Sequence, residues 1–146
     1  MSTIRHLLQI KGNDVWSTTP ETTVYNSLRL MDAKDVGALV VLEDSKLVGV
    51  VSERDYARKV ILQGRSSRET LVGDVMTKKV FTVHPDQTVQ ECMALLVDKH
   101  IRHLPVVFED RVIGVISIGD VMNDIIYQQK KSIKTLENQL LGKKAI

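Results

Sequence analysis

Apolar residues in this chain follow two alternating patterns, one of helical spacing and one of short continuous runs. Apolar positions three and four residues apart predict helices over residues 3–10 and 23–35. The continuous runs are bordered by turn-forming residues such as Glu43-Asp44-Ser45, and this predicts strands that are buried on both faces. The first half is therefore expected to contain a helix at 3–10, an extended segment from Val15, a helix at 23–35, strands at 38–42 and 47–51, and a helix from Ser52 to about Leu62.

The second half of the chain follows the same order. A polar connector at 64–68 and a short helical turn at 72–76 lead into it. Its predicted elements are an extended segment at 80–83, a helix after Pro85-Asp86, strands at 103–108 and 112–116, and a helix that begins at Ser117 and continues well past the repeat. Each half thus has the order β-α-β-β-α.

The two halves are a sequence repeat. Gly49-Val50-Val51-Ser52-Glu53-Arg54-Asp55 returns 65 residues later as Gly114-Val115-Ile116-Ser117-Ile118-Gly119-Asp120, and residues 17–61 align with 82–126 without a gap. A repeat of this length in constant register indicates one supersecondary unit used twice. Two such units commonly pack about a pseudo-two-fold axis and share a cleft, which is a usual place for ligands.

The predicted fold class is α/β of the α+β type, with two β-α-β-β-α repeats related by pseudo-two-fold symmetry. The expected parts are an N-terminal helix at 1–14, a first repeat at 15–63, a linker at 64–79, a second repeat at 80–127 and an extended C-terminal helix at 128–146. Apolar residues near the end of the chain form one helical stripe, made of Ile126, Ile133, Leu136 and Leu140. This stripe is a candidate docking or dimerisation surface.

Composition narrows the class of protein. Apolar residues make up 43% of the chain but aromatic residues only 4%, so the core is expected to be aliphatic and to include the single cysteine, Cys92. The 20 basic and 18 acidic groups leave a net charge of +2, which is too balanced to indicate a nucleic-acid partner. The longest apolar run, 38–42, is too short to span a membrane, and no signal peptide is recognised. A cytoplasmic protein is expected, with neither a membrane nor a nucleic acid as partner.

Each copy of the repeated motif ends a strand with serine and places a carboxylate three residues further on. Ser-x-x-Asp is a capping-box pattern, so Ser52 with Asp55, and Ser117 with Asp120, are expected first of all to cap helices. Because the pattern occurs twice after the same strand and the same glycine, capping alone does not account for it. Amides at a helix N-terminus bind phosphate, and a nearby carboxylate accepts hydrogen bonds from ribose hydroxyls. Together these groups suit a nucleotide.

The doubled unit, with Gly-h-h-Ser-x-x-Asp (h, hydrophobic) spanning its second strand and the start of the following helix, resembles the cystathionine-β-synthase (CBS) domain. Two such units in tandem resemble a CBS pair, also called a Bateman module. The resemblance covers roughly residues 15–127 and includes Ser-Glu-Arg-Asp-Tyr-Ala-Arg-Lys-Val at 52–60, Ile-Arg-His-Leu-Pro-Val at 101–106 and Ser-Ile-Gly-Asp at 117–120. The whole chain is similar to small stand-alone CBS-pair proteins. Such modules typically bind AMP, ADP, ATP, S-adenosylmethionine or NAD between the repeats, and they often form dimers.

The resemblance also implies a set of binding residues. Asp55 and Asp120 are expected to hold the ribose of two separate ligands. The groups expected near ribose or phosphate are Ser52, Ser117 and the amides after them, including that of Ile118. The residues expected to line the base are Ser17 and Thr18 in one copy and Thr82 and Val83 in the other. Aliphatic residues such as Val50 and Val115 are expected to enclose adenine, because aromatic residues are scarce.

The two sites are not expected to be alike. The first motif carries Arg54 and Arg58, where the second has Gly119 and Asn123. Arginine suits phosphate because its planar fork donates two parallel hydrogen bonds. The site at Asp55 is therefore expected to be the better site for a nucleoside phosphate, with Arg102 or His103 reaching it from the other repeat. A solvated helix face remains the alternative for Arg54 and Arg58.

Other chemistry finds less support in the sequence. His100 and His103 have no third ligand that would complete a metal site, and no histidine is placed to activate Ser117. Lysines near the end of the chain, with Lys143 and Lys144, are expected to form a solvated face rather than a nucleic-acid contact. The predicted function is a non-enzymatic, metal-free regulatory module, a homodimer that binds AMP, or else ADP, ATP or NAD, and signals to a separate protein. The alternative is a non-signalling scaffold that nucleotide stabilises.

Overall fold

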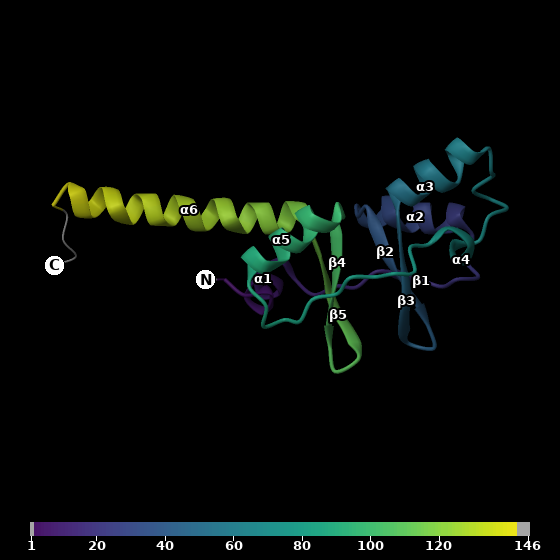
Figure 1. Ribbon diagram of the computed structural model, residues 1–146, viewed down its shortest axis with the longest axis horizontal. Helices are drawn as coiled ribbons and strands as arrows, with labels where there is room; N and C mark the ends of the chain where they lie inside the picture. Colours follow the sequence, from purple (N-terminus) through teal and green to yellow (C-terminus); the bar gives the residue numbers. More distant parts are fainter. Residues whose placement is uncertain (1, 143–146) are drawn as a thin grey trace.

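Two β-hairpins with their helices lie side by side, and one long helix extends away from them (Figure 1). The computed structural model describes residues 2–142, so residues 143–146 of the expected last helix, with Lys143 and Lys144, lie outside the described residues. The first repeat comprises β1 (Ser17–Thr18), α2 (Val24–Lys34), β2 (Ala38–Glu43), β3 (Lys46–Ser52), α3 (Glu53–Lys59) and the 3-10 turn η1 (Ile61–Gln63). The second comprises α5 (Val89–Lys99), β4 (His103–Phe108), β5 (Arg111–Ser117) and α6 (Ile118–Leu140). Two further helices, α1 (Ile4–Lys11) and α4 (Val72–Val75), precede the repeats.

Local geometry recurs at the same 65-residue offset as the sequence. The hairpin β2–β3 pairs Ala38 with Ser52, and the hairpin β4–β5 pairs the equivalent His103 with Ser117. Each hairpin has a register shift at the same place, after Val41 and after Val106. Helices α2 and α5 both begin at a threonine N-cap and both end at a left-handed residue with φ of 54°. The predicted α+β fold with two related repeats is therefore confirmed.

The repeats differ where the predicted extended segment at 80–83 enters the second hairpin. In the first repeat, β1 pairs in parallel with β2, and the amide of Val40 donates to the carbonyl of Trp16. In the second, Pro105 occupies the position of Val40, and proline has no N–H to donate. Only an isolated bridge between Val83 and Val106 forms there, so this segment is not a strand.

Helix α3 is shorter than the sequence predicts. It ends at Lys59 rather than near Leu62, and the 3-10 turn η1 follows. Gly64 closes this turn in the left-handed conformation, with φ of 70°. Val60, between α3 and η1, is fully buried, so the break in the helix turns an apolar side chain into the first repeat's core.

The segment at 64–79, expected to be a linker, contributes to the core of the first repeat. The amide of Val24 donates to the carbonyl of Thr70 over 2.8 Å, and the amide of Val72 donates to the carbonyl of Thr22 over 2.8 Å. Val72 and Val75 of α4 are buried in the same cluster as Val24. Helix α4 is thus part of the first repeat, and the connection between the repeats begins after it, at residue 76.

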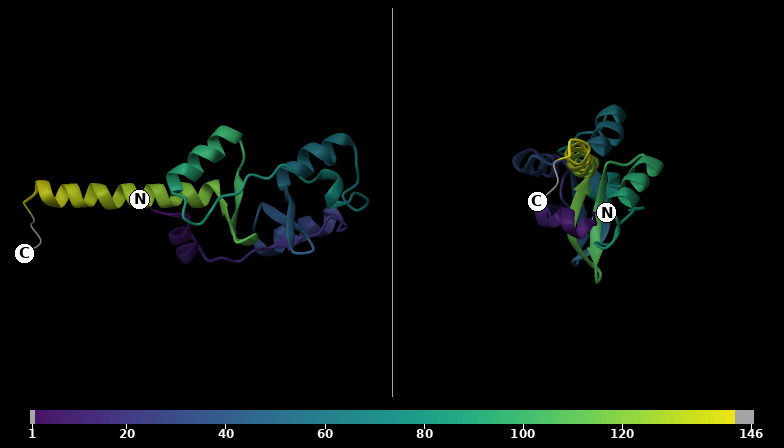
Figure 2. Two further views of the ribbon diagram at one scale, coloured as in Figure 1. Left: turned by 60° about the horizontal axis from the view of Figure 1, so that its bottom comes forward. Right: turned by 90° about the vertical axis from the view of Figure 1, so that its left-hand side faces the viewer.

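The N-terminal helix α1 packs on the second repeat, which lies furthest from it in the sequence (Figure 2). The amide of Ile4 donates to the carbonyl of Gln87 over 2.9 Å, and the amide of Val89 donates to the carbonyl of Ser2 over 3.0 Å. The same two backbone hydrogen bonds join the segment of α4 to the first half of the molecule. Each repeat is therefore completed by the segment that precedes the other one in the chain.

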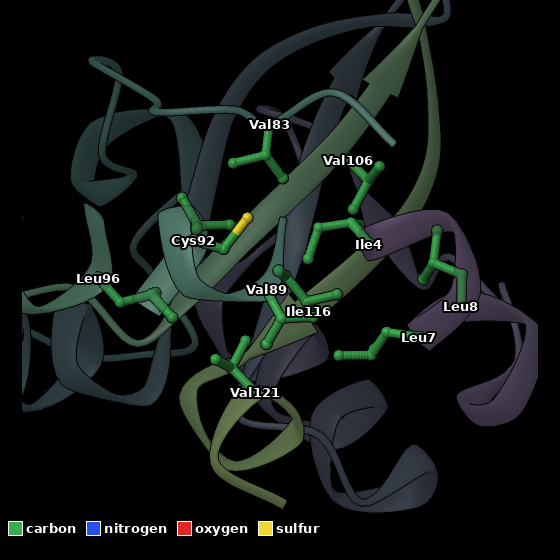
Figure 3. Close-up of a cluster of buried hydrophobic side chains, with 11 residues drawn as sticks. Ile4, Leu7, Leu8, Val83, Val89, Cys92, Leu96, Val106, Ile116 and Val121 are labelled. Carbon is green, nitrogen blue, oxygen red and sulfur yellow. The ribbon is translucent and has the colours of Figure 1, made fainter. Parts of the chain in front are cut away.

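Two separate aliphatic cores result. The first contains Val24, Met31, Leu39, Val41, Val51, Val60, Val72 and Val75. The second, shown in Figure 3, contains Ile4, Leu7, Leu8, Val83, Val89, Cys92, Leu96, Leu104, Val106, Ile116 and Val121. The expected aliphatic core and the buried position of Cys92 are both confirmed.

The glycine that begins each motif lies where another segment of the chain crosses the hairpin. The segment after α4 crosses at Gly49, and α1 crosses at Gly114. A Cβ atom at Gly49 would lie 2.7 Å from Sδ of Met76 and 3.0 Å from the carbonyl oxygen of Thr77. A Cβ atom at Gly114 would lie 2.7 Å from Cδ2 of Leu8 in α1. Such distances are below van der Waals contact, so a side chain at either position would push the crossing segment away.

Within residues 2–142, no helix is both long enough and apolar enough to cross a membrane.

Candidate functional site

The two Ser-x-x-Asp motifs form the capping boxes that their sequence predicts. The amide of Asp55 donates to Oγ of Ser52, and the amide of Ser52 donates to a carboxylate oxygen of Asp55 over 2.9 Å. Ser117 and Asp120 make the same pair of bonds at the start of α6. These reciprocal bonds hold each carboxylate at the point where a hairpin strand becomes a helix.

The carboxylate of Asp55 is almost fully engaged within the protein. Oδ2 accepts from the amide and the hydroxyl of Ser52. Oδ1 accepts from Oγ1 of Thr77 over 3.1 Å and is paired with Nζ of Lys59 at 2.9 Å. Asp55 is only 7% exposed, so these partners replace the water that a buried carboxylate would lose. A ribose hydroxyl would reach Asp55 by taking the place of the Thr77 hydroxyl.

The carboxylate of Asp120 is more open and takes its cation from another part of the chain. Oδ2 is paired with Nζ of Lys11, the last residue of α1, which also donates to the carbonyl of Val115. Asp124 stands at the position of Lys59, and its Oδ2 is buried with no partner among the described residues. The surroundings of Asp120 are consequently more negative than those of Asp55.

A cavity of about 280 Å³ lies beside Asp55, and both repeats form its wall. Val50, Ser52, Glu53, Arg54 and Asp55 come from the first motif. The remaining residues are Gly37 before β2, then Thr77, Lys79, Val80 and Phe81 from the connection to the second repeat, and Ile101, Arg102 and His103 from the start of β4. We call this the Asp55 cavity.

A cavity of about 360 Å³ lies beside Asp120 and is built from the equivalent positions. Its lining comprises Lys11, Gly12, Asp14, Trp16, Asp35, Val36, Gly37, Ala38, His103, Val115, Ser117 and Asp120. Nine of these match lining residues of the Asp55 cavity at the 65-residue offset, from Gly12 with Thr77 to Asp120 with Asp55. We call this the Asp120 cavity. The symmetry of the repeats thus produces a pair of related cavities.

An aromatic ring lines each cavity, although aromatic residues are few. Trp16 lines the Asp120 cavity and its equivalent, Phe81, lines the Asp55 cavity. The last residue of the helix that follows is a lysine that covers each ring. Nζ of Lys34 in α2 lies 4.3 Å from the centre of Trp16, and Nζ of Lys99 in α5 lies 5.2 Å from that of Phe81. These cation–π contacts hold the rings in place at the cavity walls.

The two cavities differ in charge. The Asp55 cavity is lined by three cationic side chains, Arg54, Lys79 and Arg102, against the carboxylates of Glu53 and Asp55. The Asp120 cavity is lined by one cationic side chain, that of Lys11, against three carboxylates, those of Asp14, Asp35 and Asp120. Electrostatics therefore favour phosphate in the first cavity and disfavour it in the second.

Arg54 ties the wall of the Asp55 cavity to the other repeat. Its guanidinium donates to the carbonyl of His100, at the C-terminus of α5, over 2.9 Å. That carbonyl end of the helix carries partial negative charge, which suits a cation. Arg102 is exposed at the cavity, so its guanidinium is the more available of the two for a ligand.

His103 lines both cavities. Burial lowers the pKa of its imidazole below the usual value of 6.5, and the cations of Lys11, Arg102 and Arg54 lower it further, against the opposing effect of Asp120. His103 is therefore neutral at pH 7 and contributes a hydrogen-bonding group rather than a charge.

This lowered pKa predicts a pH dependence of stability. Because the unfolded chain takes up the proton more readily than the folded one, stability falls as the pH drops below about 6.5. We expect the melting temperature to fall less steeply between about pH 7 and pH 5 in His103→Gln than in the wild type, as measured by thermal melts in a single buffer system. The exposed His6 provides the control, His6→Gln. Identical pH profiles for wild type and His103→Gln would contradict the expectation.

The structure brings most, but not all, of the predicted binding residues to the two cavities. Those that line a cavity are Val50, Ser52, Arg54, Asp55, Arg102, His103, Ser117 and Asp120, and Val115 lines one as well. The others do not line either. Arg58 is exposed on α3, Ser17 and Thr82 are exposed, Thr18 is buried and bonded to Ser27, Val83 lies in the second core, and Ile118 packs beside that core while its amide donates to the carbonyl of Arg102.

Sequence reasoning missed the residues that stand just before the predicted base-lining pairs. Trp16 with Asp14, and Phe81 with Lys79 and Thr77, line the cavities instead. The sequence does hold a signal for them, since Trp16 and Lys34 recur as Phe81 and Lys99 at the offset of the repeat. No group of three or more His, Cys, Asp or Glu side chains suited to a metal occurs among residues 2–142.

This pair of symmetric cavities between two β-α-β-β-α repeats defines the class of protein. The sequence profile of the CBS domain matches residues 9–61 and 72–127, and the chain belongs to the CBS-domain family as a tandem CBS protein. It is 40% identical, over 97% of its length and 73% of the relative's, to the CBS domain-containing protein CBSX3, mitochondrial, of Arabidopsis thaliana.

Solved structures agree with this assignment. The CBS domain structure of NE2398 is 42% identical and superposes with a TM-score of 0.83, covering 86% of this chain and 98% of that one. The CBS domain pair of protein MJ0100, solved in complex with 5′-methylthioadenosine and S-adenosyl-L-methionine, is 19% identical with a TM-score of 0.78, covering 88% and 98%. The latter likeness shows the fold alone.

Proposed function

We propose that this protein is a regulatory module that binds an adenosine nucleotide in the Asp55 cavity and signals its presence to a separate protein. The observation that carries the proposal is the composition of that cavity, where a carboxylate, an aromatic ring and three cationic side chains surround about 280 Å³. The CBS pair of MJ0100 binds two adenosine compounds, which supports ligands of this class. Its identity to this chain is too low to transfer the ligands themselves.

Each part of a nucleotide has a counterpart in the Asp55 cavity. Asp55 accepts hydrogen bonds from the ribose hydroxyls in place of Thr77, and Val50 and Phe81 contact the base. Arg102 and Lys79 line the cavity and supply cations for the phosphate, and Arg54 adds to the positive potential from its place beside His100. AMP is the first candidate, followed by ADP, ATP and NAD.

The Asp120 cavity suits an adenosine compound without phosphate groups. Its carboxylates outnumber its single lysine, and only Oδ2 of Asp120 has a hydrogen-bond partner among the described residues, which leaves Oδ1 for a ribose hydroxyl. Trp16 offers the base a ring. A ligand in this cavity binds beside Lys11. The ammonium group of Lys11 already neutralises part of the charge of the Asp120 carboxylate.

The test is a thermal-shift panel of AMP, ADP, ATP, NAD, NADH, S-adenosylmethionine and 5′-methylthioadenosine on protein stripped of bound ligand. A ligand at a hundred times its dissociation constant adds about 2.7 kcal/mol of stability. For a chain of this size that is a shift of roughly 5–10 °C. We expect AMP to shift the wild type and Asp120→Ala but not Asp55→Ala, each compared with its own ligand-free melt.

A panel without any shift would contradict the proposal. Because Asp55 is buried and caps α3, its substitution lowers stability even without ligand, so only the ligand-induced difference is informative. The alternative function, a scaffold that nucleotide merely stabilises, is separated by small-angle scattering. A sensor changes its scattering profile or oligomeric state when nucleotide is added, because the ligand binds one of its conformations more tightly than the other. A scaffold does not change.

The proposal includes a homodimer without catalytic activity of its own. Its cytoplasmic location remains a prediction, and the Arabidopsis relative bears the word mitochondrial in its name.

A further inference from the structure

Helix α6 continues far beyond the body of the protein and has no partner there among the described residues. Its first turns pack against α5, and Val121 is its one buried residue. From residue 129 to residue 140 every side chain is exposed, and the helix projects alone in Figure 1 and in the left view of Figure 2. An isolated stretch of this length is marginally stable in water, so a partner along the exposed part would stabilise the helix.

The exposed apolar residues of α6, apart from Tyr127, follow the spacing of a coiled coil. They occur alternately four and three residues apart, at Met122, Ile126, Gln129, Ile133, Leu136 and Leu140, with glutamine the single polar member. We call this set the α6 seam. Its apolar members are between 44% and 85% exposed. A strict 3.5-residue repeat keeps one seam in contact between two supercoiled helices, whereas the wider apolar stripe of a helix packed on a globular body does not require it.

We propose that the α6 seam is the interface of a homodimer, in which two copies of α6 form a parallel, in-register coiled coil. In heptad positions, Ile126, Ile133 and Leu140 stand at a, and Met122, Gln129 and Leu136 stand at d. Isoleucine at a with leucine at d, as at Ile133 and Leu136, is the combination that favours two parallel strands. The inference goes beyond the proposed dimer because it assigns the surface, the orientation and the register.

Gln129 decides between the parallel and antiparallel orientations. In a parallel, in-register pair, Gln129 meets Gln129 of the partner subunit, and the two amides can donate to and accept from each other. In an antiparallel pair, a positions face d positions. The antiparallel register that pairs all six seam residues of one copy with all six of the other would place Gln129 against Ile133 of the second copy. A buried amide without a partner costs free energy, and this disfavours the antiparallel pair.

The charges beside the seam agree with the parallel orientation. The antiparallel pair that covers all six layers would also bring the Lys130 side chains of the two copies together. In the parallel pair, Lys130 and Glu137 stand at e positions, opposite Ile125 and Ser132 at g. No like charges then face each other across the interface. The lysine stem can instead lie along the apolar surface of isoleucine.

Disulfide cross-linking of the full chain tests the orientation directly. In a parallel, in-register pair, Leu136→Cys places two thiols in the same layer, and mild oxidation is expected to give a covalent dimer on a non-reducing gel. Asn138→Cys, on the outer face, is the matched control and is expected to remain monomeric. Burial raises the pKa of the Cys92 thiol to about 11, so the native cysteine does not contribute.

A second substitution shows whether the cross-link depends on the seam. Ile133→Lys buries a charge in the layer next to Leu136 and is expected to abolish the cross-link of Leu136→Cys, whereas Asn138→Lys is expected to leave it unchanged. The proposal is overturned if Leu136→Cys gives no covalent dimer, or if the dimer persists in Ile133→Lys. Nucleotide-induced melting shifts on the same proteins are expected to be unaffected. A loss of those shifts would count against the proposed function and not against the seam.

Discussion

Ile4→Ala is expected to lower the free energy of unfolding by about 2–4 kcal/mol, in the range found for buried isoleucine-to-alanine changes. Ile4 belongs to α1, at the start of the chain, yet it is 0% exposed within the core of the second repeat. Its neighbours in that core come from α5, β4, β5 and α6, which fold back on it from far along the sequence (Figure 3). Removing three carbon atoms there leaves a cavity that these elements cannot fill.

Thermal and urea melts of the same variant provide the measurement. At roughly 2–4 °C per kcal/mol for a chain of this size, the melting temperature is expected to fall by about 4–16 °C. Ile10→Ala is the matched control, because Ile10 lies on the same helix but is 70% exposed, and its effect is expected to stay within about 0.5 kcal/mol. Equal effects of the two substitutions would contradict the packing of α1 on the second repeat.

Arg102→Glu is expected to weaken AMP binding about 10- to 100-fold. A hydrogen bond from a charged group is worth about 1.5–3 kcal/mol, and the reversed charge adds repulsion of the phosphate, which solvent partly screens at this exposed position. Arg102 lines the Asp55 cavity although it belongs to the other repeat. The loss of affinity would therefore show that a nucleotide bound next to Asp55 is held by both repeats.

The measurement is isothermal titration calorimetry at two salt concentrations. Arg58→Glu is the control, because it makes the same change in charge on the exposed side of α3, outside the cavity. We expect Arg58→Glu to bind AMP nearly as the wild type does. A larger loss in Arg58→Glu than in Arg102→Glu would place the phosphate on the α3 surface, as the sequence alone allowed.

The sequence by itself determined what depends on local hydrogen bonds and on the repeat. The capping boxes at Ser52 and Ser117 join residues three apart, so the motif predicts them directly. The hairpins follow from apolar runs around short turns, and the 65-residue offset places β4 and β5 once β2 and β3 are known. The repeated motif also indicated the CBS family. The positions of the arginines, including Arg102, predicted that the Asp55 site carries more positive charge than the Asp120 site.

Only the tertiary structure decided how the repeats complete each other. Nothing local indicates that α1 belongs to the second core and α4 to the first, because the hydrogen bonds of Ile4 and Val72 reach residues far away in the sequence. The crossing of these segments at Gly49 and Gly114 then sets where the cavities open.

The cavity walls depend on the same long-range packing. Trp16 and Phe81 stand one residue before the pairs that the sequence favoured for the base. Of those pairs, Thr18 and Val83 are paired with the hairpins and buried, whereas Ser17 and Thr82 are exposed outside the cavities. Arg58 lies one turn of α3 beyond Arg54, and it is exposed and does not line the cavity. A periodic pattern predicts which residues share a helix face, but which face meets the second repeat is decided only when the two repeats pack together.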